Sequence, residues 1–347
     1  MKKTEINLFS WVDIDKSIRA ISSDQIILII DQNLWQLYSK NFKELLKIDG
    51  KQVILWKAPD GEKVKNIKDY ETCIEFLIEK GVHRKAHVVA IGGGAVSDFA
   101  GFVAATVLRG ISWTVIPTTL LSMIDASIGG KVAINSNLGK NLIGAFHMPD
   151  QVLIDLDFLS TLENIELQSG KGELLKYCFL DEEIYKQTIA EGCSPKVIES
   201  CARFKQKITE DDFKEGGVRK ILNFGHTFGH GIERIYNIPH GEAVIWGSVI
   251  IFILFQKNDQ LKELVNLIKS MRVDVNEPPW FQKSFPLTEL MDFVGRDKKK
   301  QSNLNLDLVL IDKIGSPEIK SHSLSEIEDL FKGKLDELRN FSINGYE

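Results

Sequence analysis

The chain has 347 residues, and at about 150 residues per domain this length predicts two domains. Hydrophobic residues make up 44% and charged residues 26%, as in ordinary folded proteins, which argues against a disordered or fibrous class. The 48 acidic residues outnumber the 43 basic ones and give a net charge of −5. The whole chain therefore offers no basic surface for nucleic acid, although a local basic pocket is compatible with this balance.

Nothing in the sequence predicts a membrane or an export signal. The longest largely apolar run, 243–255, covers 13 residues, short of the roughly 20 that a membrane span needs, and it predicts a buried helix. The first ten residues lack the apolar stretch of a signal peptide. The four cysteines include no C-x-x-C pair. We therefore expect a cytoplasmic protein with no membrane partner.

The first part of the chain alternates short β-rich runs with longer amphipathic segments, a pattern typical of parallel strands with crossover helices. After residue 155 the β-rich runs thin out and helical periodicity dominates. We expect an α/β N-terminal domain over residues 1–155, with a parallel sheet and flanking helices, and a mainly α-helical C-terminal domain over 156–347. The expected strands are 25–30, 52–56, 87–91, 113–117 and 306–311; the expected helices are 64–80, 99–108, 166–179, 194–209, 219–236 and 261–271.

A glycine-rich turn predicts a nucleotide site in the α/β domain. The expected strand 87–91 runs into three glycines at 92–94 and then into an expected helix, so bare backbone amides and a helix N-terminus can meet a pyrophosphate. Asp31 follows an earlier strand and can accept hydrogen bonds from ribose hydroxyls. Ser97 breaks the usual G-x-G-x-x-G spacing, so an ordinary turn with Asp98 as a first-turn helix charge remains the alternative.

A histidine cluster predicts a metal site. His226 and His230 stand four residues apart, on one face of a helix, and His240 follows a proline turn. Imidazoles with one carboxylate form a catalytic zinc set that leaves a position for a substrate oxygen. Spacing favours His226 and His230 as ligands and leaves the third ligand open; ordinary polar roles for His230 or His240 are the alternative. The candidate carboxylates are Glu173, Glu233 and Glu242.

Basic side chains that can form an anion pocket occur in both halves of the chain. Several would have to converge to hold a doubly anionic substrate through charge-assisted contacts. Each one alone, and the run 297–300, is typical of a solvated surface charge. The candidates are Arg109, Lys131, Lys140, Lys176, Lys205, Arg219 and the lysines of the 297–300 run.

Seven motifs then follow one another in a single order over nearly the whole chain. They are GGG…D at 92–98, PTTLL at 117–121, DASIGGK at 125–131, KN at 140–141, LNFGHT at 222–227, HGEAV at 240–244 and DKK at 297–299. In these motifs the chain resembles the 3-dehydroquinate synthase family of sugar phosphate cyclases. Two features depart from the family pattern: Ile165 replaces the usual arginine before Glu166, and the turn at 236–240 is short.

The resemblance implies two cofactors and a homodimer. It implies zinc, or Co²⁺ in its place, held by Glu173, His226 and His240, with His230 facing substrate, which differs from the ligand pair that spacing favours. It places NAD in the N-terminal domain, at Asp31, Asn33, Glu62, Lys65, Gly92, Gly93, Gly94, Asp98, Thr118, Thr119, Lys140, Phe158 and Thr161. It assigns the substrate to Asp125, Lys131, Asn141, Lys176, Lys205, Arg219, Asn223, His230 and Lys299, with Arg109 reaching over from a partner subunit.

The implied reaction converts 3-deoxy-D-arabino-heptulosonate 7-phosphate to 3-dehydroquinate and phosphate. It combines transient NAD reduction, phosphate elimination, return of the hydride and an intramolecular aldol closure. Other cyclases, which make 2-deoxy-scyllo-inosose or epi-valiolone, share the metal and NAD parts. A metal-dependent polyol dehydrogenase is the further enzymatic alternative, and a catalytically silent NAD-binding protein is the alternative from another class.

Overall fold

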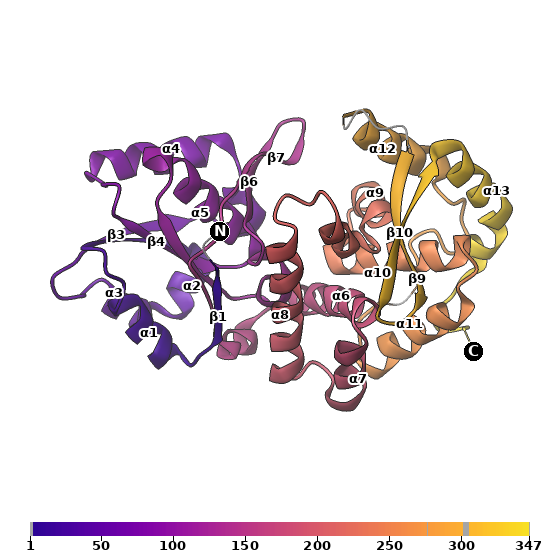
Figure 1. The fold of residues 1–347 in the computed structure, drawn as a ribbon, viewed down its shortest axis with the longest axis horizontal. Coiled ribbons are helices and arrows are strands. Elements are labelled where there is room, and N and C mark those ends of the chain that lie inside the picture. Colours follow the sequence, from indigo (N-terminus) through magenta and orange to yellow (C-terminus); the bar gives the residue numbers. More distant parts are fainter. Residues whose placement is uncertain (1–2, 276, 301–304, 347) are drawn as a thin grey trace. The chain divides into compact units, whose positions relative to one another are not determined.

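The computed structural model describes residues 3–275, 277–300 and 305–346, although not the side chains of 296–300. The chain divides into two compact units, and each is described by itself (Figure 1). The N-terminal unit comprises Met1–Glu163 and Lys205–Lys214; the C-terminal unit comprises Asn164–Phe204 and Glu215–Glu347. The division thus falls after Glu163 rather than after residue 155, and a short later segment joins the first unit.

The N-terminal unit is built on a six-stranded parallel sheet with the strand order β1-β8-β5-β4-β2-β3. All residues of β2 and β4 are buried, as expected for interior strands of a parallel sheet that is covered on both faces. Strands β2 to β5 confirm the four strands expected here, whereas the four-residue strands β1 and β8 were not foreseen. The strands are β1 (Glu5–Leu8), β2 (Gln25–Asp31), β3 (Gln52–Ala58), β4 (His87–Gly92), β5 (Ser112–Pro117) and β8 (Gln151–Ile154).

The helices of this unit begin where local capping allows. Asn66 caps α4 by accepting a hydrogen bond from the Asp69 amide, so α4 begins at Ile67 rather than at residue 64. Helix α5 begins at Gly94, directly after β4, so the expected start at residue 99 is wrong and Asp98 lies in the second turn. The helices are α1 (Trp11–Arg19), α2 (Gln32–Leu37), α3 (Ser39–Leu45), α4 (Ile67–Glu79) and α5 (Gly94–Thr106).

An antiparallel hairpin packs beside α5 and was not foreseen from the sequence. It consists of β6 (Lys131–Ser136) and β7 (Gly139–Phe146). Both strands contact α5, and β6 also contacts α4 (Figure 1). The hairpin therefore holds residues 131–146 against the helix that follows the glycine turn.

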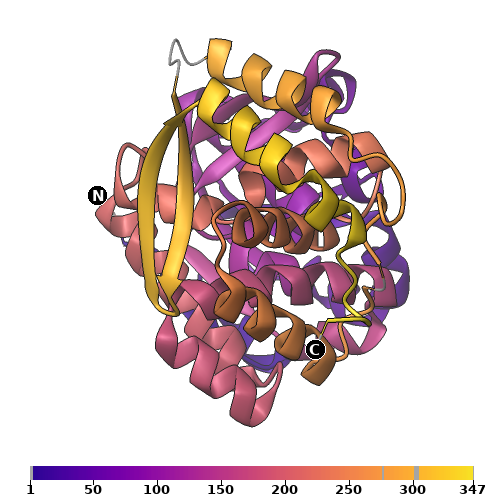
Figure 2. The same ribbon diagram turned by 90° about the vertical axis from the view of Figure 1, so that its right-hand side faces the viewer.

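The C-terminal unit is mainly helical and carries one antiparallel hairpin, β9 (Asn305–Lys313) and β10 (Ser316–Ser323). Figure 2 shows this hairpin along one side of the unit, next to α13. Strand β9 confirms the expected late strand. The helices are α6 (Asn164–Leu180), α7 (Glu182–Glu191), α8 (Pro195–Asp211, whose last residues belong to the N-terminal unit), α9 (His226–Tyr236), α10 (His240–Leu254), α11 (Asn258–Ser270), α12 (Leu287–Lys300) and α13 (Leu324–Asn340).

Helix α10 is the core of this unit and packs against α6, α9, α11 and α13. Its residues from Ala243 to Leu254 are all buried, which confirms the buried helix expected from the apolar run. No helix in the described ranges is long and apolar enough to cross a membrane.

The expected helix 219–236 is wrong as a single element. A 3₁₀ segment (Val218–Asn223) is followed by Gly225, whose φ of +77° lies in the left-handed region, and only then does α9 begin. At its other end, Asn237 with φ +51° ends α9, and Pro239 precedes α10, which makes the short turn between the two helices.

Candidate metal centre and nucleotide site

Three histidines meet in the C-terminal unit. His226 is the first residue of α9, His230 follows one turn later, and His240 is the first residue of α10. Their candidate ligand atoms lie within 4.8 Å of one another. The ring centroids of His226 and His240 are 5.3 Å apart, and those of His226 and His230 are 5.2 Å apart. The sequence named these three as one cluster and spacing favoured His226 and His230 as ligands; the fold brings His240 beside both of them.

Glu173, on α6, joins two of these histidines. Its Oε1 lies 3.0 Å from the Nε2 atom of His226 and 2.9 Å from that of His240, and the residue is 1% exposed. Its other oxygen lies 2.6 Å from the ammonium of Lys176. Within the described part of the chain, no such contact links Glu173 to His230.

The ring orientations of His226 and His240 fit a divalent metal. The Nδ1 atom of His226 lies 3.0 Å from the carbonyl oxygen of Phe224, and that of His240 lies 2.9 Å from a carboxylate oxygen of Glu233. Both partners only accept hydrogen bonds, so each Nδ1 donates and each Nε2 is the ring nitrogen that faces Glu173, where it can bind a metal once it carries no proton. An imidazole nitrogen and a carboxylate oxygen this close share either a proton or a cation, and the set of two imidazoles and one carboxylate is one that zinc accepts.

The electrostatics favour the same conclusion. Burial acts to raise the pKa of Glu173, but Lys176, His226 and His240 hold that pKa well below its usual range. Burial acts to lower the pKa of His240, but hydrogen bonds to Glu173 and Glu233 raise it to about 9. The cluster therefore presents an anionic carboxylate and favours a positive charge beside it, carried by a proton on His240 unless a metal ion takes the place of that proton.

His230 differs from the other two. Its side chain reaches solvent, yet burial and the neighbouring rings of His226 and His240 lower its pKa to about 3. Its imidazole is therefore neutral and offers one lone pair and one N–H to a ligand beside the cluster.

The three candidate carboxylates differ in the side chains that they contact. Glu173 faces the Nε2 atoms of two histidines, whereas Glu233 reaches only the Nδ1 atom of His240. Glu242 accepts a hydrogen bond from the indole nitrogen of Trp246 at 3.2 Å. Sequence spacing could not rank these three, because Glu173 lies on α6, far from α9 along the chain.

The other expected substrate residues of this unit are placed as follows. Lys176 is buried and stands 4.7 Å over the ring of Tyr177 as well as beside Glu173. Arg219 is 1% exposed, on the 3₁₀ segment before α9. Asn223 donates to Glu215 at 2.9 Å. The side chain of Lys299 lies outside the described residues.

In the N-terminal unit, the expected strand-turn-helix for an anion is present. Gly92 ends β4, Gly93 is the N-cap of α5, and the Thr118 amide donates to the Gly92 carbonyl at 3.0 Å. A Cβ added at Gly93 would lie 3.0 Å from a Thr119 side-chain carbon, and one added at Gly94 would lie 3.0 Å from the Cβ of Ala126. The N-terminus of α5 and the loop after β5 therefore approach closely at this edge of the sheet.

Asp31 stands at the same edge, because β2 pairs in parallel with β4. Its Oδ1 accepts hydrogen bonds from the amides of Asn33 and Leu34, at 2.8 and 3.2 Å. Burial raises the pKa of this carboxyl group. Asp31 thus caps α2, and the Asn33 side chain is exposed beside it.

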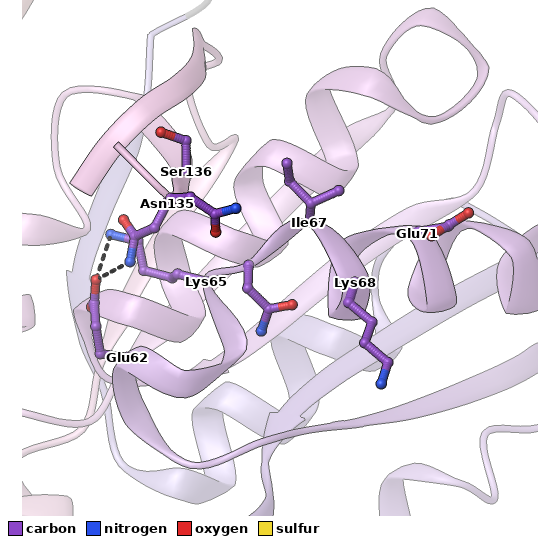
Figure 3. Close-up of a pocket in the computed structure, with 9 residues that line it drawn as sticks. Glu62, Lys65, Ile67, Lys68, Glu71, Asn135 and Ser136 are labelled. Atoms are coloured by element: carbon purple, nitrogen blue, oxygen red, sulfur yellow. Dashed lines mark hydrogen bonds and ion pairs between the residues drawn. The ribbon is translucent and has the colours of Figure 1, made fainter. Parts of the chain in front are cut away.

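A polar cluster surrounds Lys65, which is 4% exposed (Figure 3). Its ammonium lies 2.7 Å from Asp98, donates to the Asn141 side chain, and lies 3.8 Å from Glu62. Burial raises the pKa of Asp98, and the charge of Lys65 opposes that shift. Asn135 donates to Glu62 at 2.7 Å, and Glu62, Lys65 and Asn135 line a hollow of about 510 Å³ beside α4.

The remaining expected residues lie elsewhere in the same unit. The Lys205 ammonium lies 2.7 Å from both the carboxylate and the carbonyl oxygen of Asp125. Lys131 and Lys140 are exposed on the hairpin. Arg109 is exposed in a left-handed turn with φ +72°.

An aromatic group links two further expected residues. Phe158 is buried, with its ring 5.1 Å from that of Tyr38, and the Tyr38 hydroxyl lies 2.7 Å from the Thr161 hydroxyl. Sequence reasoning did not single out Tyr38, because no local pattern distinguishes it from a core aromatic residue.

Comparison with known proteins decides the family. The model of the 3-dehydroquinate synthase N-terminal domain matches residues 55–169, and that of the C-terminal domain matches residues 170–300. A 3-dehydroquinate synthase of Staphylococcus epidermidis is 38% identical over 329 residues, which cover 89% of this chain and 90% of that protein. The chain belongs to the 3-dehydroquinate synthase family. A second member, from Alkaliphilus metalliredigens, is 35% identical over 87% of this chain and 90% of its own length.

Solved structures share the fold. A 2-epi-5-epi-valiolone synthase from Streptomyces hygroscopicus, with NAD⁺ and Zn²⁺ bound, superposes with a TM-score of 0.80 at 22% identity, over 96% of this chain and 97% of that one. A 2-deoxy-scyllo-inosose synthase, complexed with carbaglucose-6-phosphate, NAD⁺ and Co²⁺, gives 0.78 at 24% identity, over 95% and 96%. A probable glycerol dehydrogenase from Sinorhizobium meliloti gives 0.59 at 16% identity, over 98% of each chain. The family fold is thus shared with other cyclases and, more distantly, with dehydrogenases.

Proposed function

We propose that the chain converts 3-deoxy-D-arabino-heptulosonate 7-phosphate to 3-dehydroquinate and phosphate. The observation that carries this proposal is the match to 3-dehydroquinate synthases over about nine tenths of both chains, across both domain models. The related cyclases match this chain at only 22–24% identity, which supports the dehydroquinate reaction over theirs.

We further propose that Glu173, His226 and His240 hold a zinc or Co²⁺ ion, and that NAD binds in the N-terminal unit. The orientation of the two Nε2 atoms toward Glu173 supports the metal, and the β4-α5 turn with Asp31 supports NAD. When bound, the metal would supply polarisation of the hydroxyl on C5 of the substrate, and NAD would supply a temporary acceptor for the hydride from that carbon. The proposed NAD residues are Asp31, Asn33, Glu62, Lys65, Gly92, Gly93, Gly94, Asp98, Thr118, Thr119, Lys140, Phe158 and Thr161.

The chain's own residues then position the substrate. Lys176 keeps Glu173 ionised and brings a positive charge to the metal cluster, where a phosphate or carboxylate of the substrate can use it. Neutral His230 can hold a substrate hydroxyl through either ring nitrogen. The substrate phosphate can itself accept the C6 proton, so no strong protein base is needed. The proposed substrate residues are Asp125, Lys131, Asn141, Lys176, Lys205, Arg219, Asn223, His230 and Lys299, with Arg109 supplied by the partner in a homodimer.

Phosphate release from this substrate, with catalytic NAD and added zinc, tests the proposal. We expect phosphate and dehydroquinate in equal amounts, the latter identified by proton NMR, with no accumulation of NADH and no reaction after EDTA treatment. Net NADH formation would favour a polyol dehydrogenase instead. A folded protein that binds NAD and zinc but leaves this substrate unchanged would contradict the substrate assignment and direct the assay to other sugar phosphates.

Replacing Glu233 should weaken metal binding although Glu233 is not a proposed ligand. Its carboxylate fixes the ring and tautomer of His240 from 2.9 Å, and the loss of such an outer partner costs about 10–100-fold in metal affinity. We expect Glu233→Ala to raise the zinc dissociation constant by this factor, and Glu233→Gln, which keeps an accepting oxygen, to raise it less. Competition with a chromophoric chelator measures the constant.

The matched control is Glu242→Ala on the neighbouring helix, whose carboxylate accepts from Trp246 rather than from a histidine. We expect its zinc affinity to stay near that of the unmodified protein. A zinc dissociation constant that is unchanged in Glu233→Ala would contradict the assignment of Glu233 as the partner that orients His240. So would weaker zinc binding in Glu242→Ala alone.

A further inference from the structure

Asn135, near the end of β6, contacts three residues that the proposed function assigns to cofactor and substrate, and Figure 3 shows it beside two of them, Glu62 and Lys65. Its Nδ2 donates to Glu62 Oε1 at 2.7 Å, and its Oδ1 accepts from the backbone amide of Asn141 at 2.8 Å. Its own backbone amide donates to the Lys65 carbonyl at 2.8 Å. Both ends of one side-chain amide are therefore used on two different site residues.

These contacts close a ring of hydrogen bonds. Asn135 donates to the Lys65 backbone, the Lys65 ammonium donates to the Asn141 side chain, and the Asn141 amide donates back to Asn135. The ammonium also pairs with Asp98 at 2.7 Å. Because each member satisfies the next, the ring fixes the direction of the Lys65 side chain and of the Asn141 side chain together.

Asn141 needs such support because of its backbone conformation. Its φ is +57°, in the left-handed region that L-residues adopt at a cost of roughly 1–2 kcal/mol, although asparagine tolerates it better than most. The hydrogen bond from its amide to Asn135 helps to hold this conformation. Without it, the bond from the Lys65 ammonium would have to hold the Asn141 side chain with no support from the Asn141 backbone amide.

We propose that Asn135 is a positioning residue that sets Glu62 for NAD and Asn141 for substrate through the two ends of its side chain. The inference rests on the proposed function, because it takes the roles of Glu62 and Asn141 from there. Asn135 itself is assigned no contact with either ligand. Its donor end acts on cofactor binding, and its acceptor end acts on substrate binding.

Two substitutions separate the two ends. Asn135→Ala removes both hydrogen bonds, and we expect it to raise the NAD dissociation constant and the substrate KM by roughly 3–10-fold each, the effect of one ordinary hydrogen bond. Asn135→Asp keeps an oxygen that accepts from Asn141 but sets a second carboxylate against Glu62. We expect Asn135→Asp to raise the NAD dissociation constant at least as much as Asn135→Ala does. The substrate KM of Asn135→Asp should stay within about twofold of that of the unmodified protein.

NAD fluorescence titration and steady-state kinetics at saturating NAD, at pH 8, measure these constants. Asn137→Ala, in the exposed turn of the same hairpin, is the matched control and should change neither constant. Thermal unfolding checks that each variant is folded; should Asn135→Ala fail to fold, the split between the two constants within Asn135→Asp alone decides.

The outcomes distinguish this inference from the proposed function. An unmodified protein that neither binds NAD nor releases phosphate contradicts the proposed function. An unmodified protein that does both, with Asn135→Asp raising the two constants equally or raising neither, overturns the positioning role of Asn135 and leaves the proposed function standing.

Discussion

His240→Ala should abolish zinc retention, whereas His230→Ala should retain zinc and lose turnover. The Nε2 atom of His240 faces the Glu173 carboxylate at 2.9 Å, and its other nitrogen is held by Glu233. Removing a ligand that is oriented from both sides should cost more than the roughly 10–100-fold that an outer partner costs. Zinc per chain after dialysis, measured by plasma mass spectrometry, reports the loss directly.

His230 should behave differently because the described contacts connect it to the other rings and not to Glu173. As a neutral imidazole that reaches solvent, it is placed to orient substrate, and we expect its removal to lower kcat on the order of 10²-fold while zinc stays bound.

The control is His83→Ala, which removes a half-buried histidine paired with Asp24 in the N-terminal unit and should affect neither zinc nor turnover. Equal zinc in His240→Ala and the unmodified protein would show that the proposed ligand set is wrong. Zinc loss in His230→Ala with retention in His240→Ala would make the three-residue set of His226, His230 and Glu173 the better one.

The contrast between the two histidines marks the limit of what spacing predicts. The i, i+4 pair indicated one helix face, and α9 does begin at His226 and carry both rings. Which ring points to the carboxylate depends on where α6 and α10 cross, and their sequences lie far apart. The sequence chemistry named His240 and Glu173 only among several candidates, and it was the family resemblance that selected them as ligands.

The same reasoning accounts for the successes and failures in the fold. Strands β2 and β4 were predictable because interior strands of a parallel sheet are continuous apolar runs. Strands β1 and β8 have four residues each, too few for a pattern. The β6-β7 hairpin turns at Asn137 and Leu138, which lack the glycine that usually indicates a tight hairpin.

The predicted first residues of two helices, α5 and α9, were wrong, and in both cases a glycine is the reason. Propensity disfavours helix at Gly94, but the cap position of Gly93 after β4 starts α5 there. Conversely, the apolar periodicity predicted one continuous helix across Gly225, but the left-handed backbone of Gly225 separates the 3₁₀ segment from α9. That break places His226 at the first position of its helix, so the error in the predicted helix lies at the metal cluster itself.

Gly172→Ala should disrupt both the stability of the C-terminal unit and its metal site. Gly172 lies on α6, next to Glu173, where this helix crosses α10. A Cβ at Gly172 would lie 2.3 Å from the carbonyl oxygen of Gly241 and 2.6 Å from its Cα, and both are backbone atoms that cannot rotate away. The helices would have to separate, and with them Glu173 and His240, the residue before Gly241.

We expect Gly172→Ala to lower the free energy of unfolding by about 3 kcal/mol or more, at or beyond the upper end of overpacking substitutions. Zinc affinity should fall in the same variant, because the 2.9 Å approach of Glu173 to His240 depends on this crossing. Denaturant unfolding and chelator competition measure the two effects separately.

Gly333→Ala is the control, and its stability should change in the opposite direction. Gly333 lies within α13, and a Cβ there would meet no atom within 4 Å. Alanine in an open helical position reduces the entropy of the unfolded chain, so we expect Gly333→Ala to stabilise the protein by about 0.5–1 kcal/mol. If both variants changed stability alike, close helix contact at Gly172 would not be the cause. If Gly172→Ala unfolded earlier yet bound zinc as tightly as the unmodified protein, the metal site would not depend on the α6-α10 crossing.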